Sequence, residues 1–436
     1  MSQLSKGGEC SLYFADIILF LFCGLPLAED LLFGMPDHSL APNFYYVSRD
    51  AATSLLYCGY ISLVPLVWWW VQPARRKVAR TPSRRVSSRA EAERWSIKHL
   101  LKYKVFMWVL LVSPTALLFI APNPRLYLDY TGFTLTTDGL INEEETFHIW
   151  VGLASMCVVI AVALLVTILP KIQPHHVLVF AAALGQAFWL NGKRAIVAIA
   201  LLTILYALWY RGALRGTRMV ASGLAVFVGL CGVSVAYQAE MRGLSIEDGS
   251  LYYDNIRMDY GRDAVIKQAI YAEINSDSRP ILEYRGQSLL FDLTFFIPRE
   301  FWPDKPWPYA VYATSAMLGN HSTESLGSGV TTSILDEAIA NLSWAGMLVG
   351  PLIVGLMCRM SDQTRNPLAK ILAVLNVILI LLVHLVAFMP FFLAWAGLVL
   401  YEAVNRRLLE KPFPEDRRRA SRLPPSAPLG SNILRL

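Results

Sequence analysis

The chain has 436 residues, of which 55% are hydrophobic and 17% are charged, and its formal net charge is +6. The apolar residues come in runs of roughly 20, about the length that crosses a bilayer core as a helix, which excludes an ordinary water-soluble domain. The basic residues collect in loops on one side of these runs, so the net charge does not indicate a nucleic-acid-binding protein.

The apolar runs predict an all-α polytopic membrane protein with about ten transmembrane helices. The acidic pair Glu29-Asp30, rather than a cleavage site for a signal peptide, follows the first run, so we expect this run to be retained as a span. The six cysteines have no CxxC spacing, which argues against a zinc site. The expected spans cover residues 11–33, 51–71, 105–121, 149–169, 176–190, 195–210, 219–238, 338–357, 371–387 and 389–404.

The loop of residues 72–104 fixes the expected orientation, because it carries eleven lysines and arginines against two glutamates. Positive charge stays on the cytoplasmic side. This rule places both termini on the cytoplasmic side of a bacterial inner membrane and residues 239–337 in the periplasm. Tight turns at 191–194 and at Met389-Pro390 separate consecutive spans, since joining either pair would put the basic tail outside. The expected organisation begins with helices one and two in residues 1–71, followed by a basic cytoplasmic loop in 72–104 and helices three to seven in 105–238. A large periplasmic loop then covers 239–337, helices eight to ten cover 338–404, and a disordered tail covers 405–436.

The periplasmic loop is far longer than usual connections, which indicates a function. Residues 262–274 predict a helix that lies on the membrane or against the bundle, and residues 289–301 form a second amphipathic run. Four prolines follow between Pro298 and Pro308 and stiffen the backbone. We therefore expect this loop to hold a defined shape at the membrane surface.

Cations on the outer face are the candidate ligands for an anion. Lys193 and Arg194 lie in an outer turn, where positive charge is normally excluded. The planar guanidinium group of arginine can donate two parallel hydrogen bonds to phosphate oxygens. For each single arginine, the alternative to phosphate binding is a salt bridge within the loop. The loop is net acidic, so any diphosphate site must be local. Its cations are Arg242, Arg257, Arg262, Lys267, Arg279, Arg285, Arg299 and Lys305.

Several motifs occur in a fixed order: Gly192-Lys193-Arg194, the proline-rich run 297–306, the Gly-rich stretch 326–330, Asp336-Glu337, Asn341 and the run 344–346. Together they resemble the Wzy-type oligosaccharide repeat-unit polymerases, which are related to the O-antigen ligases. The likeness covers residues 190–360 in detail and the whole chain in topology. It implies periplasmic polymerisation of undecaprenyl-diphosphate-linked oligosaccharides into O-antigen, capsule or exopolysaccharide, without cofactor or metal. Implied partners are a flippase and a chain-length-regulating copolymerase.

The implied reaction is a glycosyl transfer in which undecaprenyl diphosphate leaves. Charge on the leaving diphosphate would be stabilised by Lys193, Arg194, Arg299, Lys305, Arg242 and Arg285. The base that takes the acceptor proton would be Glu337, His321 or Asp336. Glu337 is the first choice because it lies where the loop re-enters the membrane. The alternatives are a helix N-terminal acid for Glu337 and a polar loop residue for His321.

Two other functions remain open from the sequence. An O-antigen ligase would use the same donor with a lipid A core acceptor. A flippase or other transporter of lipid-linked sugars would carry ionisable groups at mid-bilayer depth, whereas this chain concentrates its polar residues in one outer loop.

Overall fold

The computed structural model describes residues 11–38, 41–72, 98, 100–130, 143–214, 216–242, 249–275, 280–324, 330–364 and 366–409. Every regular element within these residues is a helix, which confirms the all-α fold class. Most of the 72–104 loop, most of the 405–436 tail, Arg279 and residues 325–329 of the Gly-rich stretch lie outside the described residues.

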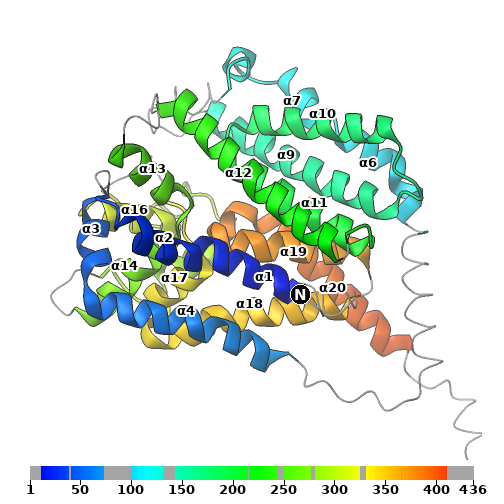
Figure 1. Ribbon diagram of the computed structural model, residues 1–436. Coiled ribbons are helices and arrows are strands. Elements are labelled where there is room, and N and C mark those ends of the chain that lie inside the picture. The colour runs from blue at the N-terminus through cyan, green and yellow to red at the C-terminus, as the bar shows by residue number, and fades with distance from the viewer. Residues whose placement is uncertain are drawn as a thin grey trace, which may run out of the picture.

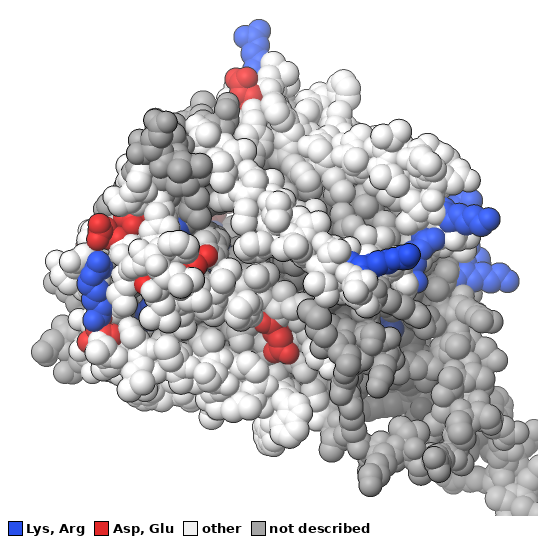
Figure 2. Space-filling model, viewed as in Figure 1, with Lys and Arg blue, Asp and Glu red and all other residues white. Residues whose placement is uncertain are grey.

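Six helical segments are long and apolar enough to cross a membrane: Ser11–Phe33, Ala51–Val71, Phe147–Ile168, Thr217–Tyr237, Ile334–Gln363 and Leu385–Asn405. Two shorter apolar helices cover Ala195–Tyr210 and Pro367–Leu382. In Figure 2, basic side chains gather at the right-hand end of the molecule, and the left-hand end carries both signs of charge. The charge distribution therefore fits a membrane-embedded bundle with two polar ends.

The bundle helices run between these two ends in Figure 1. They are α1 (Ser11–Leu19), α2 (Leu25–Phe33), α4 (Ala51–Val71), α6 (Lys104–Leu110), α7 (Ser113–Leu118), α9 (Glu143–Ile168), α10 (Pro174–Asn191), α11 (Arg194–Tyr210), α12 (Thr217–Arg242), α18 (Gly346–Gln363), α19 (Pro367–Leu382) and α20 (Met389–Leu409). Short 3-10 turns cover Leu101–Tyr103, Pro124–Tyr127, Ser343–Ala345 and Leu385–Phe388.

The described part of residues 239–345, which we call the outer segment, packs onto one end of the bundle. Its helices are α13 (Ser250–Tyr260), α14 (Asp263–Ile274), α15 (Gln287–Thr294), α16 (Tyr309–Met317) and α17 (Ile334–Leu342). In Figure 1, α13, α14, α16 and α17 gather at the left-hand end together with α3 (Pro42–Arg49). The outer segment is therefore a helical part of the fold rather than an extended loop.

A break in the first span anchors the outer segment. A π turn at Phe20–Gly24 separates α1 from α2, and Pro26 follows in the first turn of α2. Because proline has no N–H, the carbonyl of Phe22 lacks its usual helical donor. The backbone N–H of Arg262 donates to that carbonyl at 2.8 Å. The Tyr57 hydroxyl donates to the carbonyl of Cys23 at 2.7 Å, so α4 also binds at the break.

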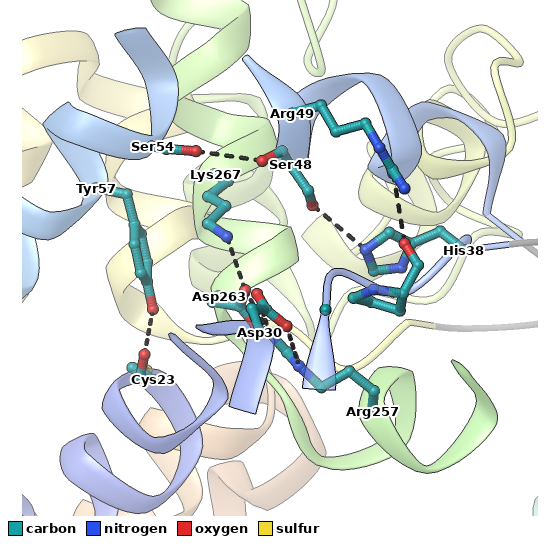
Figure 3. Close-up of polar contacts among 12 residues, drawn as sticks. Cys23, Asp30, His38, Ser48, Arg49, Ser54, Tyr57, Arg257, Asp263 and Lys267 are labelled. Atoms are coloured by element: carbon teal, nitrogen blue, oxygen red, sulfur yellow. Dashed lines mark hydrogen bonds and ion pairs between the residues drawn. The ribbon is translucent and has the colours of Figure 1, made fainter. Parts of the chain in front are cut away.

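Four charged side chains, which we call the ion cluster, reinforce this anchor: Asp30, Arg257, Asp263 and Lys267 (Figure 3). The Arg257 guanidinium donates to Asp30 at 3.0 and 3.1 Å and to Asp263 at 2.7 and 2.9 Å. Lys267 donates to Asp263 at 3.0 Å. A Cβ at Gly261 would lie 2.0 Å from Arg257 Nη1, so only glycine leaves room for this arrangement.

Electrostatics explain why the ion cluster tolerates its burial. The Arg257 and Lys267 side chains are only 2% and 1% exposed. Burial alone would raise the pKa of Asp263, but the charges of Arg257 and Lys267 hold it well below its usual range. Asp263 therefore stays ionised and compensates both cations, as a buried charge requires.

The span expected at 338–357 is wrong as a single helix. α17 ends at Leu342, and Ser343 adopts a positive φ of 56° before α18 begins. A Cβ at Gly346 would lie 2.0 Å from the carbonyl oxygen of Ala338, and one at Gly350 would lie 3.0 Å from that of Ile334. Positions 334 and 350 meet only if α17 folds back against α18, so the apolar segment Ile334–Gln363 is a tight helical hairpin and not one straight helix.

The remaining expected elements are either confirmed by the observed helices or differ from them in their bounds. The run 105–121 forms two short helices, α6 and α7, and the run 289–301 forms the shorter α15. The helix expected at 262–274 is α14, and Asp263–Ile270 are all buried, so it packs against the bundle rather than lying on a membrane surface. Gly192, with φ of 66°, separates α10 from α11, which confirms that expected separation. The expected break at Met389-Pro390 is misplaced: α19 ends at Leu382, Val383 and His384 are extended, and the 3-10 turn Leu385–Phe388 runs directly into α20.

Removing the central cation of the ion cluster tests the anchor. Arg257→Ala leaves Asp30 and Asp263 buried without that partner, so we expect it to lower the free energy of unfolding by about 3–5 kcal/mol. The matched control is Arg49→Ala, which breaks an ion pair with Asp37 whose side chains are 34% and 70% exposed and loses less than about 1 kcal/mol. Thermal unfolding in detergent measures both, and equal losses would contradict a central role for Arg257.

Candidate functional site

Two of the three expected base candidates lie in the first turn of α17. Asp336 caps this helix, because its Oδ1 accepts hydrogen bonds from the Ser333 hydroxyl and from the Ser333 backbone N–H, the latter at 2.8 Å. The Asp336 side chain is 1% exposed, and its Oδ2 has no hydrogen-bond partner. The helix-capping role considered for Glu337 therefore belongs to Asp336.

Glu337 lies on the side of α17 that faces α15. The Ser288 hydroxyl donates to Glu337 Oε1 at 2.7 Å. Asn341 Nδ2 donates to the Ser288 hydroxyl at 2.7 Å and to the Glu337 carbonyl at 2.8 Å. Glu337 is 1% exposed. Its carboxyl group is thus buried and held in place by a residue of α15.

Asp292 and Tyr309 complete a group of four side chains that we call the carboxyl cluster. Its members are Asp292, Tyr309, Asp336 and Glu337. Burial raises the pKa of the half-buried Asp292 to about 7. Tyr309 is 1% exposed, and its hydroxyl has no hydrogen-bond partner. Burial, together with the charges of Asp336, Glu337 and Glu273, raises the pKa of Tyr309 well above its usual value. Acid and phenol groups from three helices therefore converge at one place.

His321 lies in another part of the outer segment, beside Glu283. Its backbone N–H donates to Glu324 at 3.2 Å, and the neighbouring Ser322 hydroxyl donates to Glu283. The hydrogen bonds from Ser322 and Gln287 lower the pKa of Glu283, to which the His321 charge also contributes. The described contacts thus join His321 to Glu283 rather than to the carboxyl cluster.

Arg285, expected as a phosphate ligand, connects α14 to α17. Its guanidinium forms a two-pronged ion pair with Glu273 and donates to the Ala340 carbonyl at 2.8 Å. Glu273 also accepts from the Ser343 hydroxyl at 2.6 Å, at the tip of the helical hairpin. The salt-bridge alternative considered for single arginines therefore describes Arg285.

Arg299 and Lys305 shape the proline-rich stretch of residues 295–307, which we call the cation frame. Arg299 donates to the carbonyls of Lys305 and Pro306 at 2.6 and 2.7 Å and lies 3.6 Å from the centre of the Trp307 ring. Lys305 Nζ donates to the carbonyls of Phe295 and Ile297 at 3.0 and 2.9 Å. Burial and the charge of Arg299 lower the pKa of Lys305, so the two cations act on each other.

The remaining expected ligands lie at helix ends. Lys193 is exposed at the N-terminal cap of α11, within electrostatic range of His148 and His384. Arg194 begins α11 and Arg242 ends α12, but their side chains lie outside the described part of the structure.

A surface pocket of about 370 Å³ opens beside the ion cluster. It contains two carboxylates and no Lys or Arg among its lining residues, so it does not suit a diphosphate. Its lining residues are Phe33, Met35, Pro36, Asp37, Gly249, Ser250, Tyr253 and Asp254. Among the described residues, no group of three or more His, Cys, Asp or Glu side chains could hold a metal ion.

No protein-family model, no characterised protein and no solved structure matches this chain. Its chemistry must therefore be argued from its own residues. The sequence reasoning missed Ser288, Asp292 and Tyr309. A signal was present for Asp292, because it lies in the predicted amphipathic run 289–301, where position 288 is one helical turn before it on the same face.

Proposed function

We propose that the chain is a glycosyltransferase that polymerises undecaprenyl-diphosphate-linked oligosaccharide repeat units at the periplasmic face of a bacterial inner membrane. The observation that carries this proposal is that α15 joins two kinds of group within one short stretch. One face of α15 contacts the carboxyl cluster through Ser288, and the chain continues directly into the cation frame. A base and a diphosphate site on consecutive elements are what this reaction requires.

In the proposed step, a sugar hydroxyl of the acceptor attacks the anomeric carbon of the donor. The new C–O bond forms as the bond to the diphosphate oxygen breaks, and the electron pair leaves with undecaprenyl diphosphate. Arg299 is partly exposed and supplies N–H donors to the diphosphate, while the buried Lys305 adds charge. A carboxylate of the carboxyl cluster takes the hydroxyl proton, a contribution worth about 10²- to 10⁴-fold.

The membrane topology belongs to the same proposal. We expect ten crossings of a bacterial inner membrane, with both termini in the cytoplasm and the outer segment in the periplasm, because the 72–104 loop is strongly basic. Reporter fusions after Arg94 and after Arg422 should both indicate the cytoplasm, and a fusion at Ser278 should indicate the periplasm. A cytoplasmic signal at Ser278 would place the site on the wrong face and refute this topology.

A transporter of lipid-linked sugars is the second candidate. The π turn in the first span and the α17–α18 hairpin favour it, since transporters place substrates at broken helices. Against it, the ion cluster and the carboxyl cluster both involve the outer segment, at one end of the bundle. A ligase would use the same donor chemistry with another acceptor.

Purified protein in vesicles with a lipid-diphosphate-linked repeat unit tests these functions together. We expect a ladder of longer lipid-linked oligosaccharides. Arg299→Ala should slow elongation by roughly 30- to 1000-fold, because a charge-assisted contact to the leaving group is lost. Arg299→Lys should restore it only partly, since lysine lacks the planar guanidinium group.

The matched control is Arg359→Ala, because Arg359 also donates to a backbone carbonyl, that of Val71, at 3.1 Å. We expect this variant to elongate normally. Elongation by Arg299→Ala at the unmodified rate would remove Arg299 from the site. Movement of the lipid across the vesicle without elongation would instead favour the transporter, and transfer only to lipid A core would favour the ligase.

A further inference from the structure

The burial of Glu337 raises the question of which carboxyl group meets the acceptor. Glu337 and Ser288 are 1% and 0% exposed, so neither reaches the surface. Asp292 lies one helical turn after Ser288 on α15, on the same face of that helix, and its side chain is only partly buried. Asp292 therefore lies between the buried Glu337 and the surface of the outer segment.

Charged and titratable groups approach this position from four helices. They are Asp292 on α15, Asp336 and Glu337 on α17, Tyr309 on α16, and Glu273 on α14, which is paired with Arg285. Within the described part of the structure, no ion pair compensates Asp292 or Glu337. Glu337 lies within electrostatic range of Asp292, and two carboxyl groups in that range without a cation do not ionise together readily.

We propose that Asp292 is the catalytic base of the glycosyl transfer and that Glu337, held by Ser288, is its positioning partner; this assignment rests on the proposed function. The acceptor O–H bond breaks, its proton passes to an Asp292 carboxylate oxygen, and the oxygen bonds to the anomeric carbon as the diphosphate leaves with its electron pair. Asp292 then releases the proton to solvent before the next cycle.

The location of the cation frame supports this assignment. Lys305 Nζ lies 4.7 Å from the centre of the ring of Phe291, the residue next to Asp292. The cation frame therefore lies against α15, next to the position of Asp292 in the chain. The pKa of Asp292, which burial raises to about 7, also suits a base that works near neutral pH.

Elongation rates between pH 5 and pH 9 test the assignment in purified full-length protein. The unmodified rate should fall as the pH drops through about 7, because the ionised carboxylate is the active form. Asp292→Asn should lower the rate by about 10²- to 10⁴-fold and remove this fall. Glu337→Gln can still accept the Ser288 hydrogen bond. Its elongation rate should fall by less than about tenfold and should still decrease as the pH drops through about 7. Asp129→Asn, which changes an exposed aspartate outside the outer segment, is the matched control and should behave as the unmodified protein.

A rate for Asp292→Asn equal to that of the unmodified protein would overturn the assignment. A loss in Glu337→Gln as large as that in Asp292→Asn would overturn it too and return the base to Glu337. If the unmodified protein elongates nothing under any condition, the proposed function itself has failed.

Thermal unfolding gives a second measurement that does not depend on activity. The pKa of Asp292 is raised from 3.8 to about 7, so the stability that its protonated form provides is complete below about pH 4 and is lost as the pH rises through 7. The melting temperature of Asp292→Asn relative to the unmodified protein should therefore increase from pH 4 to about pH 7 and then level off. A difference that does not change with pH would show that Asp292 does not titrate near neutrality and would overturn the assignment.

Discussion

The missing backbone N–H of Pro26 is the constraint on which the outer segment depends. It interrupts the first span and leaves the Phe22 carbonyl to accept a hydrogen bond from Arg262. The ion cluster then closes around the same place, since Asp30 at the end of this span pairs with Arg257. These contacts convert a long loop into a docked helical layer. A site on that layer gains a fixed position relative to the membrane helices.

The helical hairpin fixes the other side of the site. α17 can lie close to α18 only because Gly346 and Gly350 have no side chains at the contact. Arg285 and Glu273 then hold α14 and the hairpin together. The first turn of α17, with Asp336 and Glu337, is thus enclosed by three helices of the outer segment. Packing, rather than a loop conformation, sets the geometry of the carboxyl cluster.

Sequence periodicity predicted the elements whose signal is local. α14 and the turn at Gly192 each follow from apolar spacing or from a breaking residue. The α17–α18 hairpin was not predicted because the residues on both sides of Ser343 are apolar, so hydropathy alone predicts a single span there. Only the close contacts of Gly346 with Ala338 and of Gly350 with Ile334, sixteen residues earlier, show the reversal.

The roles of the cations could not be predicted because their partners are distant or belong to the backbone. Arg257 pairs with Asp30 across 227 positions of the chain. Arg299 donates to carbonyls of a proline-rich stretch, and no side-chain pattern reveals that arrangement. Counting the lysines and arginines along the sequence therefore identified where positive charge gathers, but not which of these side chains have partners within the protein. The same limit explains why Asp292 was not among the base candidates, since the burial of Glu337 depends on tertiary packing.

Amide hydrogen exchange in lipid nanodiscs tests most directly whether the outer segment is part of the bundle. If the break at Pro26 anchors it, the amides of residues 262–274 should exchange as slowly as those in the middle of α4, because both belong to one packed unit. Exchange of residues 262–274 at the rate of an unprotected loop, with α4 still protected, would contradict the account.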